Sequence, residues 1–282
     1  SYAEVPMASM NLRFDQKNIV IEDNQFKLND YHIYAAGQEP FTITGIVDFR
    51  KLDRPIADLR LIADNYLLIN NSRRTRSTEL YGRLAVSLNT TVKGPLDGLK
   101  MRGNMRILGS TDLTYILKDS PLSVQDRLSD QVTFTNFADS LSTDSTAEVV
   151  AYNPSTMDLM LNLTIDPAVR VRAELSADGS NYVDLEGGGN LVLQGDPQSN
   201  LSLTGRYTLS SGVLKYAFSM IPLKEFNITS GSYVQWNGNL MNPQLHITAV
   251  EVIRSVVTGE NNNSRQVNFN ISVILSNTLD NL

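Results

Sequence analysis

The chain has 282 residues, a net charge of −6, no cysteine and only 19% charged residues. Acidic and basic residues are interspersed, which argues against nucleic acid as a partner, because nucleic-acid-binding domains gather basic side chains on one face. The absence of cysteine favours an exported protein and, with only two isolated histidines, leaves no spacing for a zinc site. Neither a metal nor a cofactor is therefore expected. No run of about 18 apolar residues is present, so no segment is predicted to cross a bilayer as a helix.

The first half of the chain is predicted to form strands, because apolar residues alternate with polar ones, as over residues 41–49. Residues 54–66 have apolar side chains at mixed spacing, and a strand is favoured there over a helical turn. Arg73, Arg74 and Arg76 form the only basic cluster. It is interpreted as a solvated hairpin tip, with a contact to anionic lipid headgroups as the alternative.

The middle of the chain is predicted to be a flexible loop over about residues 119–148, since this segment is rich in Ser, Thr and Asp. One or two helical turns are expected within it, over residues 123–130. The loop gives a weak subdivision of the chain near residue 150, although the composition on its two sides is alike.

The second half of the chain shows the clearest alternation. Strands are predicted over residues 157–165, 169–175, 191–193, 201–209, 214–218, 226–228, 245–249 and 267–275. Turns are predicted at residues 178–179, 187–189, 211–212, 230–232, 237–238 and 242–243, because Gly, Asn and Pro supply the backbone angles of tight turns. Residues 92–122 also resemble residues 193–223, with Gly94 and Gly103 matching Gly195 and Gly205, which indicates duplicated hairpin units along one sheet.

The last third of the chain carries a motif of fixed residues, G-x-Y-x-L-x-S-G-x-L-x-Y, then P-L-x-x-F-x-I-x-x-G-S-Y-V-x-W-x-G, then N-P-x-L-x-I-x-A. Its landmarks are Gly205, Gly212, Pro222, Gly231, Trp236, Gly238, Asn242 and Pro243. This motif resembles the C-terminal domain of the TamB proteins, a family of long AsmA-like proteins of the bacterial envelope. Upstream of about residue 190 the resemblance is only one of short alternating strands.

The resemblance implies an all-β fold, an elongated antiparallel sheet curled into an open trough with an apolar interior. A long sheet with one dry face and no helices must cover that face by curling over itself. The whole chain, residues 1–282, is expected to be one continuous domain and an excised fragment of a longer protein. The final strand, residues 267–275, lacks Pro, Gly and charge, so it is expected to pair with a further strand or a second copy.

By the same resemblance, the domain is expected to be part of a conduit that shields phospholipid acyl chains between the inner and outer membranes and supports outer-membrane assembly. The implied partners are phospholipid and, near the C-terminal end, a BamA-type outer-membrane barrel protein (TamA-like). The full-length protein is expected to be anchored in the inner membrane, with this part in the periplasm. The predicted groove lining is Leu159, Leu161, Leu163, Val169, Val171, Leu191, Leu193, Leu201, Leu203, Tyr207, Leu209, Leu214, Tyr216, Phe218, Phe226 and Ile228.

Two rival interpretations stay open from the sequence. The first is a closed β-solenoid or adhesive exported domain that functions through its outer surface. The second is an enzyme, which is disfavoured because the chain has no nucleophile elbow or phosphate-binding loop and its histidines, His32 and His246, are predicted to be surface residues. Trp236 is interpreted as a sheet-packing residue, with a place at the mouth of a lipid surface as the alternative. A calcium site at Asp178 and Asp184 is a minor alternative.

Overall fold

The structure is a computed structural model that describes residues 2–5, 10–15, 19–71, 80–116, 157–176, 178–196, 201–218, 221–258, 264–278 and 281. Every element within these ranges is a strand, and all of them belong to one 16-stranded sheet, which confirms the all-β prediction. The basic cluster at residues 73–76, the loop predicted over residues 119–148 and its helical turns lie outside the described ranges.

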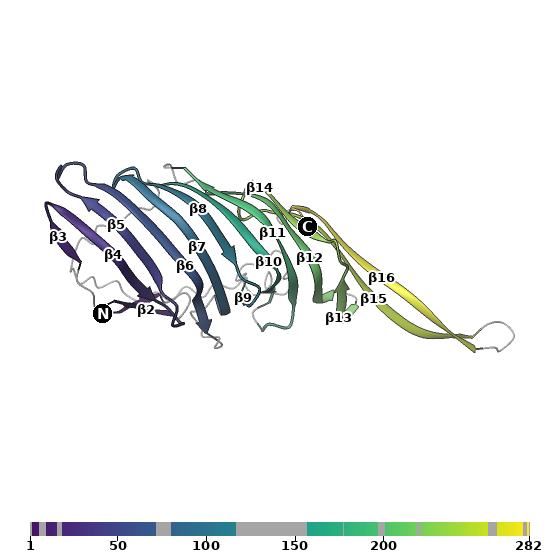
Figure 1. The fold of residues 1–282 in the computed structure, drawn as a ribbon. Coiled ribbons are helices and arrows are strands. Elements are labelled where there is room, and N and C mark those ends of the chain that lie inside the picture. The colour runs from purple at the N-terminus through teal and green to yellow at the C-terminus, as the bar shows by residue number, and fades with distance from the viewer. Residues whose placement is uncertain are drawn as a thin grey trace, which may run out of the picture.

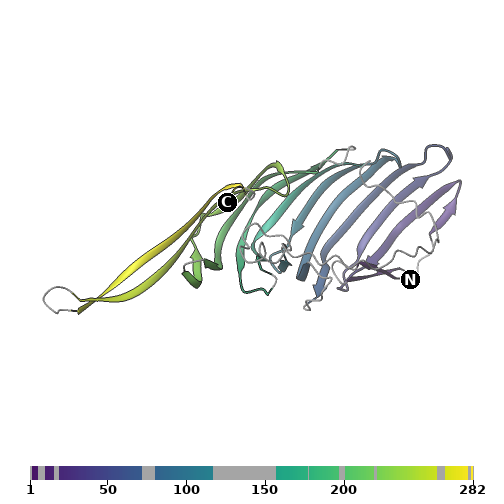
Figure 2. The ribbon, with the colours of Figure 1, turned by 180° about the vertical axis from the view of Figure 1, so that it is seen from behind.

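The strands follow one another along the sheet almost in chain order (Figure 1; Figure 2 shows the reverse side). They are β1 (Tyr2–Val5), β2 (Met10–Phe14), β3 (Val20–Glu22), β4 (Gln25–Tyr34), β5 (Phe41–Asp48), β6 (Ile56–Asn71), β7 (Leu80–Pro95), β8 (Lys100–Ile107), β9 (Asp112–Ile116), β10 (Asp158–Glu174), β11 (Tyr182–Gly195), β12 (Leu201–Phe218), β13 (Ile221–Ile228), β14 (Tyr233–Asn239), β15 (Gln244–Thr258) and β16 (Ser264–Thr278). The strand predicted over residues 54–66 is confirmed as β6.

The sheet is antiparallel at every described pairing except around β10, which runs parallel to both β8 and β9. This is a correction to the fully antiparallel sheet expected from the sequence. β8 and β9 act as one long strand interrupted at residues 108–111, since both lie between β7 and β10. A parallel pair needs a connection of a dozen residues or more, and residues 117–157 supply that length. Short-range alternation carries no information on strand direction.

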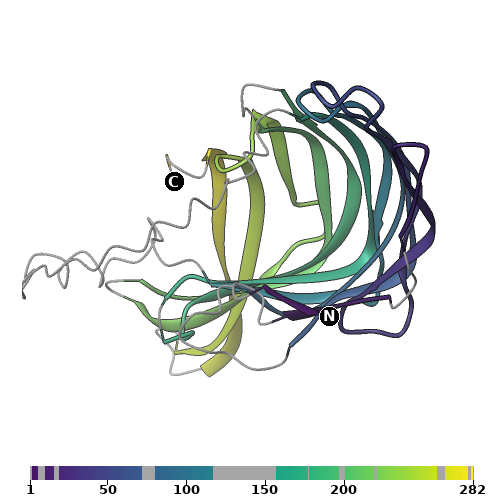
Figure 3. The ribbon, with the colours of Figure 1, turned by 90° about the vertical axis from the view of Figure 1, so that its left-hand side faces the viewer.

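The long strands bend where their registers shift. β10 has an irregularity between Ile165 and Val169, beside the interruption at residues 108–111, and β11 shifts against β12 at Glu186 and Gly187. Bulges of this kind sharpen the twist and bend of a strand. Viewed along its long axis, the sheet accordingly curls around an interior (Figure 3).

Several predicted turns are strand interiors instead. Residues 187–189 lie inside β11, residues 211–212 inside β12 and residues 237–238 inside β14. The strands predicted over residues 157–165 and 169–175 form the single strand β10, with an irregularity at residues 166–167. The glycines of β11 allow the backbone of β12 to lie close to them. A Cβ on Gly189 would lie 2.0 Å from the Arg206 carbonyl oxygen, and a Cβ on Gly187 would lie 2.2 Å from the Thr208 carbonyl oxygen. The turns predicted at residues 230–232 and 242–243 are confirmed.

The last two strands form an arm that projects beyond the curled body (Figure 1). β15 pairs with β14 through Gln244–His246 and with β13 through Ala249 and Val250, and from Glu251 to Thr258 it pairs only with β16 among the described strands. β16 has β15 as its one neighbour in the described sheet, so it lies at an edge, as the sequence predicts. The pairing of that edge with a further strand stays a prediction.

Candidate functional site: the inner face of the curled sheet

The inner face of the sheet is built from rows of side chains that face the same way on neighbouring strands. One row passes through Phe41, Ala63, Leu88, Met105, Leu163, Leu191, Gly205 and Trp236. The next passes through Ile43, Leu61, Thr90, Gly103, Leu161, Leu193, Leu203 and Gly238. Within β4–β12 and β14, no described Asp, Glu, Lys or Arg occupies these rows or the inner positions beside them, whereas on β13 Lys224 pairs with Tyr216. The inner face is therefore apolar and uncharged across most of the sheet.

The charged residues gather on the outer face, where they pair across strands. Arg102 bonds to Asp158 at 2.6 Å, Arg106 to Asp166 at 2.6 Å, and Arg170 to Glu186 at 3.1 Å. The hydrogen bond from Arg102 lowers the pKa of Asp158 below its ordinary value. Exposed pairs of this kind contribute little stability each. Their arrangement keeps every charge of these strands on the side away from the apolar rows.

The predicted lining residues all lie on strands whose side chains alternate between these two faces, but they differ in exposure. Buried members are Leu161, Val169, Leu191, Leu203, Tyr207, Leu209, Leu214, Phe226 and Ile228; half-buried members are Leu159, Leu163, Val171, Leu193 and Tyr216; Leu201 is exposed. Phe218 lies in β12, and the structure describes its backbone only. The half-buried group is concentrated on β10 and β11, at the centre of the sheet.

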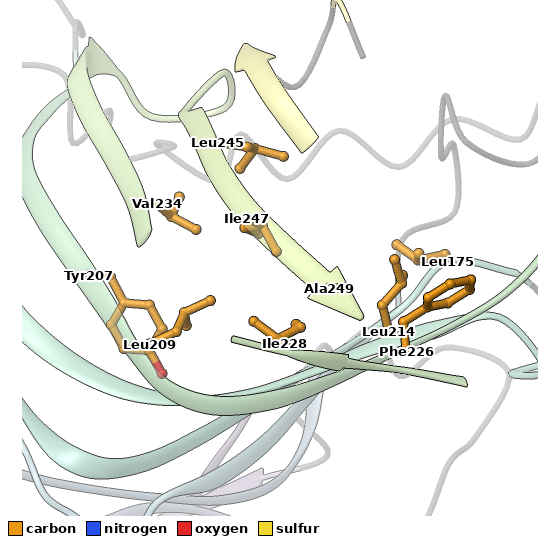
Figure 4. Close-up of a cluster of buried hydrophobic side chains, with 10 residues drawn as sticks. All are labelled: Leu175, Tyr207, Leu209, Leu214, Phe226, Ile228, Val234, Leu245, Ile247 and Ala249. Carbon is orange, nitrogen blue, oxygen red and sulfur yellow. The ribbon is translucent and has the colours of Figure 1, made fainter. Parts of the chain in front are cut away.

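The C-terminal part of the interior is a packed core. Residues of β12–β15, together with Leu175 after β10, form a single cluster of buried side chains (Figure 4). Its members are Leu175, Tyr207, Leu209, Leu214, Phe226, Ile228, Val234, Leu245, Ile247 and Ala249. The open trough expected from the sequence is therefore filled at this end, because the sheet curls tightly enough for its inner side chains to contact one another.

Tyr207 connects two strands on the inner side of the bent sheet. Its hydroxyl donates to the Val169 carbonyl oxygen at 3.2 Å, so the side chain on β12 reaches β10 across β11. Tyr207 pairs with Gly189 and Val169 pairs with Gly187, so no β11 side chain lies between them. Burial raises the pKa of Tyr207 to about 12. The glycines of β11 and this tyrosine thus form one structural unit.

The motif residues of the last third have mainly structural roles. Gly205 and Gly238 have φ angles of 127° and 120°, and a Cβ on Gly205 would lie 2.4 Å from the Asn190 carbonyl oxygen. Trp236 packs against the C-terminal cluster and its indole nitrogen donates to the Leu240 carbonyl oxygen at 3.1 Å, which closes the turn containing Asn242 and Pro243. The sheet-packing role of Trp236 is therefore present in the structure.

The candidate chemical residues are not brought together. His246 stacks on Tyr233 with ring centroids 4.5 Å apart, and His32 lies 3.4 Å from Asp15. Hydrogen bonds from Ser176 and Ser180 to Asp178 lower the pKa of Asp178 to about 2, so this carboxylate caps its own turn. The described residues contain no group of three His, Cys, Asp or Glu placed to hold a metal ion.

The N-terminal half of the inner face lies outside the lining predicted from the sequence. Ala63, Tyr66, Val86 and Leu88 form a second buried cluster, against which Phe41, Leu61 and Met105 pack. Val86 and Leu88 show the same alternation that marked the C-terminal lining, whereas Ala63 and Tyr66 come from the segment of mixed apolar spacing and are separated by a register shift in β6. No helix long and apolar enough to cross a membrane is found among the residues that the structure describes.

Comparison with known proteins gives one informative result. The family model of the TamB C-terminal domain matches residues 29–282, which covers nearly the whole chain, including β5 to β11 upstream of the motif. No curated protein and no solved structure matches the chain.

Proposed function

Because this chain belongs to the TamB family, whose C-terminal domain it matches over residues 29–282, we propose that it shields phospholipid acyl chains during their passage between the two membranes of the cell envelope. The family places the chain in the envelope, in the TamB assembly module. The observation that carries the proposal is the inner face: two neighbouring apolar rows run without a charged side chain from β5 to β14.

Such a face suits this cargo on energetic grounds. Exposing a methylene group to water costs about 0.8 kcal/mol, so an acyl chain of about 16 carbons faces a barrier of roughly 12 kcal/mol in crossing an aqueous space. A continuous apolar surface lowers that barrier without needing any specific contact. A charged group in the same place would cost several kcal/mol on contact with a tail, so uncharged rows suit an acyl chain.

The exposures divide the lining into two roles. The residues with almost no exposure, such as Leu209 and Phe226 at 1% each, hold the curl closed. The half-buried residues Leu159, Leu163 and Leu193 of β10 and β11 are the ones that an acyl chain contacts. We place the lipid path over these central strands, beside the packed C-terminal cluster.

The remaining parts of the proposal follow from the family. The full-length protein is anchored in the inner membrane with this domain in the periplasm, and the domain acts without catalysis. Its protein partner is an outer-membrane barrel protein of the BamA type near the C-terminal end. A closed adhesive solenoid, the rival interpretation, predicts that no lipid contacts the inner face.

The test is a photo-crosslinking experiment with adjacent positions of β10. A photoreactive amino acid at Leu163 faces the inner rows, and one at Asn162, which is exposed, faces outward. We expect lipid adducts from Leu163 and none above background from Asn162, and we expect phospholipid in organic extracts of the purified protein. Equal labelling of the two positions, or lipid-free protein, contradicts the proposed function.

A further inference from the structure

A pocket lies at the N-terminal end of the sheet, where β3 and β4 are found, at the opposite end from the β15–β16 arm (Figure 1). Its volume is about 430 Å³. The apolar part of its lining comes from Ile21, Phe26, Phe49 and Leu52. Small-molecule sites in proteins have volumes of about 300–1,000 Å³, so this pocket is large enough to hold a ligand.

The β3–β4 hairpin places two of these side chains on the inner face of the sheet. Its turn residues, 23–24, have φ angles of 54° and 58°, as a tight two-residue hairpin turn requires. Ile21 pairs with Phe26, and Phe26 pairs with Val47 of β5, so these three side chains face the same way. Val47 lies four residues from Ile43, a member of the inner rows, and side chains alternate along a strand. The pocket therefore opens on the inner face.

An uncharged row of inner positions leads from this pocket to the centre of the sheet. The row passes from β4 to β10 through Leu28, Gly45, Leu59, Val92, Met101 and Leu159. Phe26 lies two residues from Leu28 on β4 and so shares its face. All members of the row except Val92 are half-buried, so the row is accessible along most of its length. Five strand spacings of about 4.8 Å separate Leu28 from Leu159, a distance of about 24 Å.

The two ends of the inner face differ in how far they are covered. At the pocket, Ile21 is 70% exposed and Leu52 is 83% exposed, while Phe26 and Phe49 are half-buried. The rings of Phe26 and Phe49 contact each other edge to face, with centroids 4.8 Å apart, which fixes one wall of the pocket. At the other end, the packed C-terminal cluster fills the interior. A ligand therefore reaches the inner face more readily from the N-terminal end.

We propose that this pocket is the mouth of the lipid path, where an acyl chain enters or leaves the inner face. This inference rests on the proposed function. The row from Leu28 to Leu159 identifies the occupant, because it joins the pocket to one of the half-buried residues that an acyl chain contacts, with no charged side chain between them.

A strand of a second copy or of another protein fits this end of the sheet less well. β3 has only three residues, so its edge offers few backbone groups for strand addition. Strand addition also uses the backbone and does not depend on which face a side chain takes. An acyl chain in the pocket depends on the inner side chains, and a comparison of the two faces of β3 therefore separates these occupants.

The experiment compares Ile21→Asp with Val20→Asp in the purified protein. Both residues belong to β3 and both are exposed, but Ile21 pairs with Phe26 in the pocket, whereas Val20 faces the other way and pairs with Lys27. Each protein is mixed with phosphatidylethanolamine–phosphatidylglycerol vesicles that contain a fluorescent phospholipid, and the rate of transfer to unlabelled vesicles is measured. A phospholipid with a photoreactive acyl chain is crosslinked in a parallel sample, and mass spectrometry locates the adducts. Light scattering gives the oligomeric state.

We expect Ile21→Asp to lower the transfer rate by about tenfold, because a charge in the pocket opposes contact with an acyl chain. Leu52→Asp, a second change in the pocket, is expected to have the same effect. Val20→Asp is expected to transfer within about twofold of the wild type, since a surface change away from the path is nearly neutral. In the wild type, adducts are expected at Phe26 or Phe49 as well as on β10 and β11.

A loss of transfer in Ile21→Asp that is no larger than in Val20→Asp overturns the inference. Adducts on β10 and β11 with none in the pocket also overturn it, and both results leave the proposed function intact. An equal loss in both variants with a change in oligomeric state assigns the edge of β3 to contact between copies instead. A wild-type protein that gives no lipid adduct removes the proposed function itself, and the inference with it.

Discussion

Replacing Tyr207 with phenylalanine is expected to weaken the fold at neutral pH and to remove part of its sensitivity to alkali. The hydroxyl of Tyr207 donates to the Val169 carbonyl oxygen at 3.2 Å, and both residues are buried, at 6% and 2% exposure. Tyr207→Phe removes this hydrogen bond from an apolar interior. The net loss of a hydrogen bond costs about 1 kcal/mol, so the free energy of unfolding at pH 8 is expected to fall by about that amount.

At alkaline pH the tyrosine at position 207 lowers the stability of the wild type, which the phenylalanine variant avoids. Burial raises the pKa of Tyr207 to about 12, compared with about 10 for an unfolded tyrosine. The folded state therefore favours the neutral phenol, and its contribution to stability is complete below about pH 10 and is lost as the pH rises through 12. A difference of about 2 pKa units corresponds to a loss of roughly 2 kcal/mol from the wild type between about pH 9 and pH 12.

The assay is urea unfolding of wild type, Tyr207→Phe and Tyr115→Phe at pH 8 and at alkaline pH. Tyr115 is 39% exposed and serves as the control for the loss of a hydroxyl. The stability gap between wild type and Tyr207→Phe is expected to shrink as the pH rises, whereas Tyr115→Phe is expected to stay near the wild type at pH 8. Two results would refute the stabilising role of the Tyr207–Val169 hydrogen bond and of the buried phenol. One is a Tyr207→Phe variant as stable as the wild type at pH 8. The other is a difference in the free energy of unfolding that does not change with pH.

Three further predictions concern the curl and its lining. Gly189→Val is expected to prevent formation of the bend, because its Cβ would lie 2.0 Å from the Arg206 carbonyl oxygen. Circular dichroism and expression yield measure whether the variant folds, and a normally folded variant contradicts the prediction. Phe226→Ala is expected to lower the free energy of unfolding, as measured in urea, by about 3–5 kcal/mol, because Phe226 is 1% exposed. A loss below about 1 kcal/mol would show that Phe226 does not belong to the core. In cells carrying the full-length protein, Leu203→Arg is expected to weaken the outer-membrane barrier to detergents and large antibiotics, because an unpaired charge on the inner face costs several kcal/mol. Arg170→Leu on the outer face is its control, and equal effects of the two changes argue against the assignment of faces.

Much of the sheet follows from local sequence. Strict alternation over residues 157–165, 169–175 and 245–249 predicts both the strands and the face each side chain takes, because side chains on a strand alternate between two faces. The inner positions predicted on β10–β12 accordingly fall in the observed inner rows. The same local signal extends to β5, β7 and β8, whereas β6 combines mixed apolar spacing with register shifts between Ala63 and Tyr66 and between Leu67 and Ile69.

Glycine occurs both in tight turns and in strand interiors where backbones lie close together, and local sequence does not distinguish the two. Residues 187–189 and 237–238 have the composition of turns, but the structure places them in strand interiors, where neighbouring backbones leave no room for a Cβ at Gly187 or Gly189. Close approach depends on which strands lie on either side, and this is a property of the assembled sheet. The single bent strand β10, predicted as two strands around Pro167, was missed for the same reason.

What the sequence determined by itself is the all-β class, the two faces of each strand and the apolar character of the inner one, because alternation and the choice of apolar or polar residue at each position are local properties. What only the tertiary structure decided is how those faces are used. The parallel pairing of β10 with β8 and β9, the contact of Tyr207 with Val169 and the filling of the interior at β12–β15 all join residues distant in the chain. Their formation depends on the direction, register and curvature of neighbouring strands, which no short stretch of sequence contains.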